Sequence, residues 1–188
     1  MDPQPSLETE RLRLRPLELS DAPRVQELAG EGAVAIMTTN IPHPYSAGMA
    51  ERWITIHRQH YARGELATFA VALLADGTFI GAVSLHFDSA HERAELGYWI
   101  GLPYWGKGYC TEAARAVVRY GFEQRALHRI SSCHFGTNLR SARVLQKLGM
   151  TNEGCQRQHI KKGDEFYDLY RYGILRAEYD ALKALEPL

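Results

Sequence analysis

The spacing of apolar and polar positions changes along the chain, and each change predicts an element. Residues 7–16 alternate, with Leu12 and Leu14 on one side and arginines on the other, which predicts a half-buried strand. A Ser-Asp pair before Pro23 indicates the start of a first helix. Ser46 opens a second segment, in which apolar residues recur at helical spacing. The first third of the chain is therefore expected to fold as a strand followed by two helices.

From Thr68 the period changes to two. Alternating apolar residues run up to Asp76 and Gly77, a pair typical of a tight hairpin turn, and continue on the other side through residues 83–87. After a polar turn, residues 94–100 alternate again. This pattern predicts three consecutive antiparallel strands.

The last third of the chain alternates between helical and extended patterns. A helix is expected to run to about residue 124, followed by a strand over 130–135 and a helix from Asn138 to Leu148. Two final strands are expected near 154–161 and 165–175. The order β-α-α-β-β-β-α-β-α-β-β predicts one α/β (α+β) domain over residues 1–188, with flexible ends at 1–6 and 184–188.

Composition narrows the class of protein. The 188 residues suit one domain, and 45% apolar with 23% charged residues is an ordinary globular composition. Twenty-two basic residues balance twenty-two acidic ones, so the chain lacks the broad positive field of a nucleic-acid-binding protein. The longest apolar run, residues 69–75, is too short to cross a membrane. Three scattered cysteines and an N-terminus without a secretory signal favour the cytoplasm.

The stretch with the clearest chemical signal is residues 101–113, which lie between a predicted strand and a predicted helix. Gly106 and Gly108 let the backbone approach a ligand closely, and the first N–H groups of a helix have no partner within it. Together they are typical of a site for phosphate or pyrophosphate. A glycine-rich turn without a ligand is the simpler alternative.

Two nucleotide-binding motifs fit this stretch poorly. The dinucleotide motif GxGxxG fails because Thr111 stands at the third glycine position. The phosphate loop GxxxxGK[ST] matches from Gly101 to Lys107, but Gly108 replaces the hydroxyl residue that would bind magnesium. A site for a nucleoside triphosphate is therefore the weaker interpretation.

Residues 105–110, Trp-Gly-Lys-Gly-Tyr-Cys, resemble the coenzyme A loop of the GNAT N-acetyltransferase superfamily, whose core is Q/R-x-x-G-x-G/A. Trp105 stands at the usual Gln/Arg position and Cys110 at the usual small residue. The resemblance covers nearly the whole chain and points to the RimJ/RimL-like branch, which acetylates the N-termini of ribosomal proteins. Its other motifs are Leu-Glu-Thr-Glu-Arg-Leu-Arg-Leu-Arg-Pro at 7–16, Ile-Pro-His-Pro-Tyr at 41–45, Glu-Leu-Gly-Tyr-Trp-Ile at 95–100 and Asn138-x-x-Ser141-x5-Lys147-x-Gly149.

This resemblance implies a mixed, mostly antiparallel sheet with helices on both faces and a splayed slot for the cofactor. It also implies transfer of acetyl from acetyl-CoA, the co-substrate, to a primary amine. No metal is expected, since His57 and His60 have no third ligand within reach in the sequence. The residues expected to bind acetyl-CoA are Trp99, Ile100, Leu102, Gly106, Lys107, Gly108, Cys110, Thr111 and Asn138.

Two residues are candidates for the proton transfers. Glu95 lies on a strand among apolar neighbours and is the candidate general base, acting through water; a structural carboxylate is the alternative. Ser141, near a helix N-terminus, is the candidate proton donor to the leaving thiolate, and a second helix cap is the alternative. By motif alignment, the N–H near Ile100 would face the thioester oxygen. Cys110 is expected to pack rather than to react.

The acceptor is expected to be a protein N-terminal α-amine, with His43, Tyr45 and Trp53 near it. Trp53 as plain core packing is the alternative. A small-molecule amine (amino acid, polyamine or antibiotic) is the second candidate acceptor. A non-catalytic protein that binds coenzyme A is a third interpretation. A homodimer is possible, and neither nucleic acid nor a membrane is expected as a partner.

Overall fold

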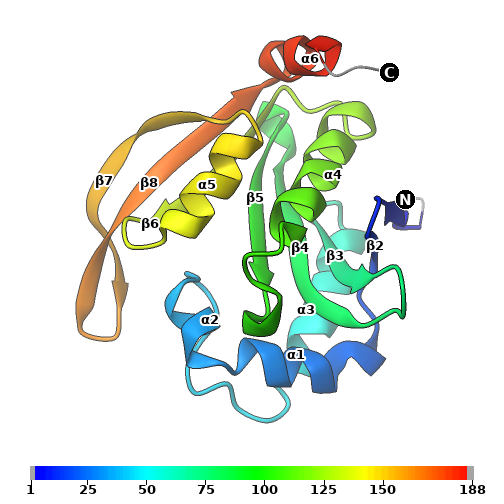
Figure 1. Ribbon diagram of the computed structural model, residues 1–188, viewed down its shortest axis with the longest axis vertical. Coiled ribbons are helices and arrows are strands. Elements are labelled where there is room, and N and C mark those ends of the chain that lie inside the picture. Colours follow the sequence, from blue (N-terminus) through cyan, green and yellow to red (C-terminus); the bar gives the residue numbers. More distant parts are fainter. Residues whose placement is uncertain (1–2, 186–188) are drawn as a thin grey trace.

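The computed structural model describes residues 3–185, which form one sheet with helices on both faces (Figure 1). Of the ends expected to be flexible, 1–6 and 184–188, residues 1–2 and 186–188 lie outside the described residues. Gln4 donates a side-chain hydrogen bond to the Thr68 carbonyl oxygen (2.8 Å). The strands are β1 (Leu7–Glu8), β2 (Leu12–Pro16), β3 (Leu66–Leu73), β4 (Phe79–Asp88), β5 (Arg93–Ile100), β6 (Arg129–Phe135), β7 (Thr151–Lys162) and β8 (Glu165–Leu175). The helices are α1 (Ala22–Ala29), α2 (Gly32–Ile36), α3 (Met49–Ala62), α4 (Tyr109–Glu123), α5 (Leu139–Lys147) and α6 (Arg176–Leu185), with short 3-10 turns at Leu19–Asp21, Ser89–His91 and Leu102–Tyr104.

Within the described residues the sheet has the order β1-β2-β3-β4-β5-β6-β8-β7. Neighbouring strands are antiparallel except β5 and β6, which run parallel. Their pairing covers Arg93 to Glu95 on β5 and Arg129 to Ser131 on β6. Beyond these residues β5 and β6 no longer pair with each other, so the sheet splits between them. The mixed, mostly antiparallel sheet and its splayed slot are confirmed.

The helices bury two separate cores against the sheet. On one face, α4 packs its apolar side, including Ala114 and Val117, against Leu85 and Leu96 of the central strands. On the other face, α1 and α3 enclose a smaller core that includes Leu28 and Ile54. In Figure 1, α4 and α5 lie in front of the sheet and α3 lies behind it.

The hairpin predicted from Asp76 and Gly77 is present. Gly77 has φ +75°, a backbone conformation that residues other than glycine rarely adopt, and its N–H donates to the Leu73 carbonyl oxygen (2.9 Å). Asn138 caps α5 by accepting a hydrogen bond from the Ser141 backbone N–H (3.1 Å). These local predictions hold because each depends on contacts within a few residues.

One predicted strand is divided in the structure, and two helices were not predicted. Residues 7–16 form two short strands rather than one, because a turn at residues 9–11 lets Leu7 pair with Leu14. Helix α2 has five residues, too short to show a helical period. Helix α6, which was not predicted, follows β8 directly. It packs on a distant part of the chain, since the ring of Tyr179 stacks on that of Phe122 in α4 (centroids 4.7 Å apart).

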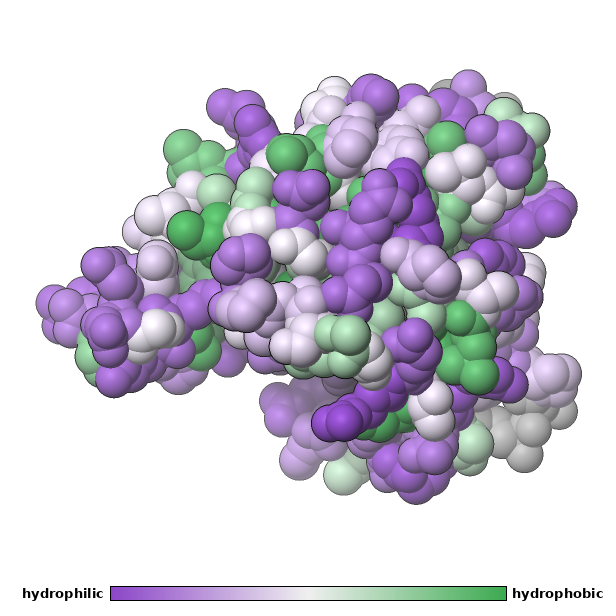
Figure 2. Space-filling model, turned by 90° about the horizontal axis from the view of Figure 1, so that it is seen from below, coloured by the Kyte–Doolittle hydropathy of each residue, from purple (hydrophilic) through white to green (hydrophobic). Residues whose placement is uncertain are grey.

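The hairpin of β7 and β8 projects from the body of the molecule, and Figure 2 shows its mostly hydrophilic surface at the left of that view. Its outer strand β7 is exposed along most of its length. In the described part of the chain, no helix is long and apolar enough to cross a membrane.

Candidate functional site

A cavity of about 660 Å³ opens where β5 and β6 separate. Its walls come from the end of β5, the following glycine loop and the first turn of α4, from one side of α5, and from α2 with the residues after it. The fold thus brings together residues from three separate parts of the sequence. The residues predicted for the site that line it are Trp99, Ile100, Gly106, Gly108, Cys110, Thr111, Asn138 and Ser141.

The glycine loop forms one end of the cavity. Gly106 and Gly108 have φ +76° and +84°, and a Cβ added at Gly106 would meet no atom within 4 Å. Gly108 is the N-cap of α4, so the unpartnered N–H groups of the first helical turn begin here. Arg11 holds the loop from outside by donating to the Lys107 carbonyl oxygen (3.1 Å). The geometry fits a diphosphate at the helix N-terminus.

The cavity wall is positively charged. Arg140, Arg143 and Lys147 line it, and none of the lining residues described between 3 and 185 is a carboxylate. The Arg140 guanidinium lies over the ring of Trp105 (4.9 Å to the centroid), and the Trp105 indole N–H donates to the Ile100 carbonyl oxygen (2.6 Å). Trp105 therefore connects the loop to the end of β5 and packs against the Arg140 guanidinium.

The middle of the cavity holds two hydroxyl groups in contact. Tyr98 Oη lies 2.7 Å from Ser141 Oγ, and either can donate the hydrogen bond. Ser141 is 7% exposed, and burial raises the pKa of Tyr98, so that its phenol stays protonated. Tyr98 is not among the residues that the sequence motifs single out. Its alternation with Leu96 and Ile100 placed it on a buried face, but no pattern could show which hydroxyl it would meet.

Alternate backbone N–H groups at the end of β5 point into the split. Gly101 N–H donates to Ile80 on β4 (2.8 Å), and Leu96 carbonyl oxygen accepts from Ser132 Oγ on β6 (2.8 Å). Successive residues of a strand direct their polar backbone groups to opposite edges. The N–H of Ile100 therefore points to the edge that faces β6.

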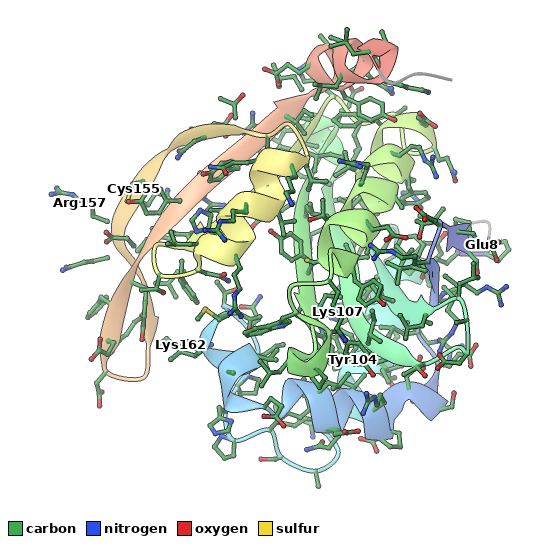
Figure 3. All side chains as sticks on the ribbon, viewed as in Figure 1. Glu8, Tyr104, Lys107, Cys155, Arg157 and Lys162 are labelled. Atoms are coloured by element: carbon green, nitrogen blue, oxygen red, sulfur yellow. The ribbon has the colours of Figure 1, made fainter. Side chains whose placement is uncertain are left out.

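Three other predicted residues lie outside the cavity lining. Glu95 is the last paired residue of β5, and its side chain is 48% exposed beside Arg171 (3.6 Å between Oε2 and Nη1) and Cys133. The apolar surroundings expected for this carboxylate are therefore not found. Leu102 is exposed, and Lys107 directs its ammonium to the ring of Tyr104 (5.6 Å to the centroid), as Figure 3 shows.

The residues predicted for the acceptor lie on the opposite side of β5. The rings of Trp53 and Trp99 meet edge to face (6.4 Å between centroids), so Trp53 is one residue removed from the cavity. Tyr45 packs on the core of α1 and α3, and the ring of His43 lies against Gly32 at the start of α2. The structure does not bring His43 and Tyr45 to the cavity itself.

Burial sets the protonation of two further groups. It raises the pKa of Cys110 to about 12, so this thiol in the cavity wall stays protonated. It lowers the pKa of His57 to about 4, with the nearby His86 and His60 contributing, so that His57 is neutral at pH 7. His57 Nδ1 lies 2.7 Å from Thr68 Oγ1. Residues 3–185 contain no group of three His, Cys, Asp or Glu that could hold a metal ion.

A protein-family comparison identifies the fold that carries this cavity. The family model described as an acetyltransferase (GNAT) domain matches residues 11–151. This range is more than half of the chain. The chain belongs to the GNAT acetyltransferase family. It is an N-acetyltransferase of the family, whose members use acetyl-CoA as acetyl donor.

Individual GNAT relatives are similar over nearly the full chain. YdaF of Bacillus subtilis, whose name assigns it provisionally to ribosomal N-acetylation, is 33% identical over 178 residues, 93% of this chain and 96% of YdaF. The structure of a GNAT acetyltransferase from Bacillus anthracis has a TM-score of 0.82 at 28% identity, covering 92% of this chain and 99% of that one. RimL, a ribosomal L7/L12 α-N-protein acetyltransferase solved with coenzyme A, has a TM-score of 0.84 at 16% identity and shares the fold; the match covers 91% of this chain and 98% of RimL.

Proposed function

We propose that this enzyme acetylates the α-amine at the N-terminus of a protein, using acetyl-CoA bound in the cavity between β5 and β6. One observation supports the cofactor site above all others. The split in the sheet leads to a glycine-lined helix N-terminus with Arg140, Arg143 and Lys147 beside it. This arrangement suits a long ligand with an extended amide arm and a diphosphate at one end.

The backbone residues take the roles of binding and polarisation in this proposal. The N–H groups at Gly108 and the first turn of α4 bind the diphosphate, and Asn138 orients α5 beside the arm. The N–H of Ile100 donates to the thioester oxygen as negative charge develops there. No metal is needed, because the donors are fixed in the backbone and point to the place where charge appears.

Ser141 and Glu95 take the proton transfers. Ser141 donates a proton to the leaving thiolate and regains one from water, and the Tyr98 hydroxyl 2.7 Å away stays protonated and orients Ser141 through their hydrogen bond. Glu95 accepts the amine proton through water, which its exposure and its place at the start of the split permit. Glu95 and the acceptor-side aromatic residue Trp53 lie outside the cavity lining, on the side from which an amine would approach Trp99.

Amine chemistry and the relatives favour an α-amine. An α-amine has a pKa of about 8 and a lysine amine about 10.4, so at pH 7 roughly 10% and 0.04% are neutral nucleophiles. None of the described residues that line the cavity is a carboxylate able to take a proton from a charged lysine, so the site suits the α-amine better. The provisional name of YdaF points the same way.

Release of coenzyme A thiol in the presence of an amine panel tests the proposal. The panel holds peptides with free N-termini, N-acetylated peptides with one lysine, amino acids and spermidine. We expect release with free N-termini, and Ser141→Ala should lower kcat about 100-fold while still binding acetyl-CoA. Binding of acetyl-CoA without release for any amine would overturn the catalytic role, and release with spermidine alone would replace the acceptor. Stabilisation by ATP with magnesium instead of acetyl-CoA would refute the cofactor assignment.

A further inference from the structure

One lysine at the tip of the β7–β8 hairpin reaches across to the segment around α2. Lys162 Nζ donates to the carbonyl oxygens of Ala35 and Thr38, and it lies 3.4 Å from that of Ile41. Residues 34–41 are called the α2 segment below. Figure 3 shows the Lys162 side chain extending from the hairpin toward α2. The contact joins parts of the chain more than 120 residues apart.

The α2 segment is held by two buried side chains and by polar contacts from outside. Helix α2 has five residues, fewer than an isolated helix needs to persist in water; Val34 and Ala35 are buried, whereas Ile36 is 52% exposed. No helix or strand follows until α3 begins at Met49. Besides Lys162, Asn138 holds the segment by donating from Nδ2 to the Met37 carbonyl oxygen (3.2 Å). Polar contacts from outside therefore act together with the burial of Val34 and Ala35 to fix where the segment lies.

The same segment forms one wall of the cavity between β5 and β6. Val34, Met37 and Thr38 line that cavity, so a displacement of the α2 segment changes the cavity directly. We propose that Lys162 is a positioning residue that holds the α2 segment against the bound acetyl-CoA and couples the hairpin to cofactor binding. This inference rests on the proposed use of the cavity for acetyl-CoA.

The chemistry of the contact suits a lysine. An ammonium carries three N–H donors and no acceptor, and three backbone carbonyls converge on it here. Carbonyl groups near the end of a helix also carry partial negative charge, which favours a cation. Burial lowers the pKa of Lys162 from its ordinary value of 10.5. A methionine at this position would leave these carbonyl oxygens without their hydrogen-bond donor.

The neighbouring Lys161 is a matched control. It lies on the same strand and has the same charge, but it is exposed and its ammonium lies over the Phe166 ring (5.8 Å to the centroid). Lys162→Met and Lys161→Met therefore remove one charge each from the hairpin tip. Only the first removes a contact with the α2 segment. Lys162→Gln serves as a second variant should Lys162→Met fail to fold.

The first measurement is amide hydrogen exchange of residues 34–41 without any ligand. We expect exchange to become about tenfold faster in Lys162→Met and to stay at the wild-type rate in Lys161→Met. Equal rates in both variants and wild type would overturn the contact as a positioning device. This arm is independent of what the enzyme acetylates.

The second measurement is the Kd for acetyl-CoA, followed by kcat and KM with a reactive amine. Lys162→Met should raise the Kd about tenfold, equivalent to about 1.4 kcal/mol, with kcat at saturating acetyl-CoA changed less than about twofold. A fall in kcat with an unchanged Kd would refute the positioning role. Faster exchange in a protein whose wild type binds no acetyl-CoA would retain the contact but overturn the coupling, and it would count against the proposed function separately.

Discussion

At the scale of single residues, the cavity joins side chains that the sequence motifs single out with others that they do not. Ser141 was identified from its motif beside a helix N-terminus, whereas its partner Tyr98 comes from a strand 43 residues earlier. Alternation along β5 puts Tyr98 on the same side of the strand as Leu96 and Ile100. Which hydroxyl it would contact depends on how α5 packs on the sheet. The Tyr98–Ser141 pair therefore had to come from the structure.

The surroundings of Glu95 differ from those that the sequence predicted. Apolar neighbours along the strand suggested a shielded carboxylate, but these neighbours alternate to the far face and leave Glu95 half-exposed beside Arg171. Its proposed role as base rests instead on its place where β5 and β6 part.

Replacing this carboxylate measures that role. Glu95→Gln should lower kcat about 100-fold, since a positioned general base contributes at least that much, with KM for acetyl-CoA unchanged. Glu92→Gln, an exposed carboxylate just before β5, is the control and should retain wild-type kcat. A loss of less than about threefold in Glu95→Gln would remove Glu95 as the base.

At the scale of elements, the glycine loop and α4 act as one unit. The loop ends at Gly108, the helix begins at Tyr109, and positive φ angles at Gly106 and Gly108 turn the chain so that the helix N-terminus faces the cavity. Motif reasoning located this unit because the loop and the first turn of α4 lie within about ten consecutive residues. Its opposing wall, α2, gave no pattern long enough to detect.

Gly77 and Gly106 have nearly the same backbone conformation, so comparing their alanine variants distinguishes a loss of stability from a loss of cofactor binding. Gly106 has φ +76° and Gly77 has φ +75°, and a Cβ at either would meet open space. Changing either to alanine should destabilise the fold by about 1 kcal/mol, because the left-handed conformation disfavours a Cβ. Only Gly106→Ala should also weaken acetyl-CoA binding, by about tenfold, because its Cβ enters the ligand cradle. Thermal unfolding and acetyl-CoA titration of both variants check this, and equal Kd values would contradict the cradle.

At the scale of the whole molecule, burial of a neutral histidine makes stability depend on pH. His57 joins α3 to β3 through Thr68, and its pKa is lowered to about 4 from an ordinary value of 6.5. Between these values the unfolded chain binds more protons than the folded one. The contribution of His57 to the free energy of unfolding is therefore complete above about pH 6.5 and falls as pH drops toward 4.

Urea unfolding at pH 7 and pH 5 tests this linkage. The loss of unfolding free energy between the two pH values should be smaller in His57→Gln than in wild type, by about 1 kcal/mol after allowance for partial exposure to solvent. His159→Gln, on the exposed strand β7, should behave as wild type. The same pH dependence in wild type and His57→Gln would show that another group is responsible.

The sequence by itself determined most local elements and the glycine loop, because periodicity, caps and the glycine motif involve residues close together in the chain. It predicted the mixed sheet, and it singled out Gly106, Gly108 and Asn138, which line the cavity. Only the tertiary structure decided how Tyr98 meets Ser141, where Glu95 points, and which carbonyls Lys162 binds. These contacts join residues from about forty to more than 120 positions apart, and such distances are set by the packing of whole elements rather than by local preference.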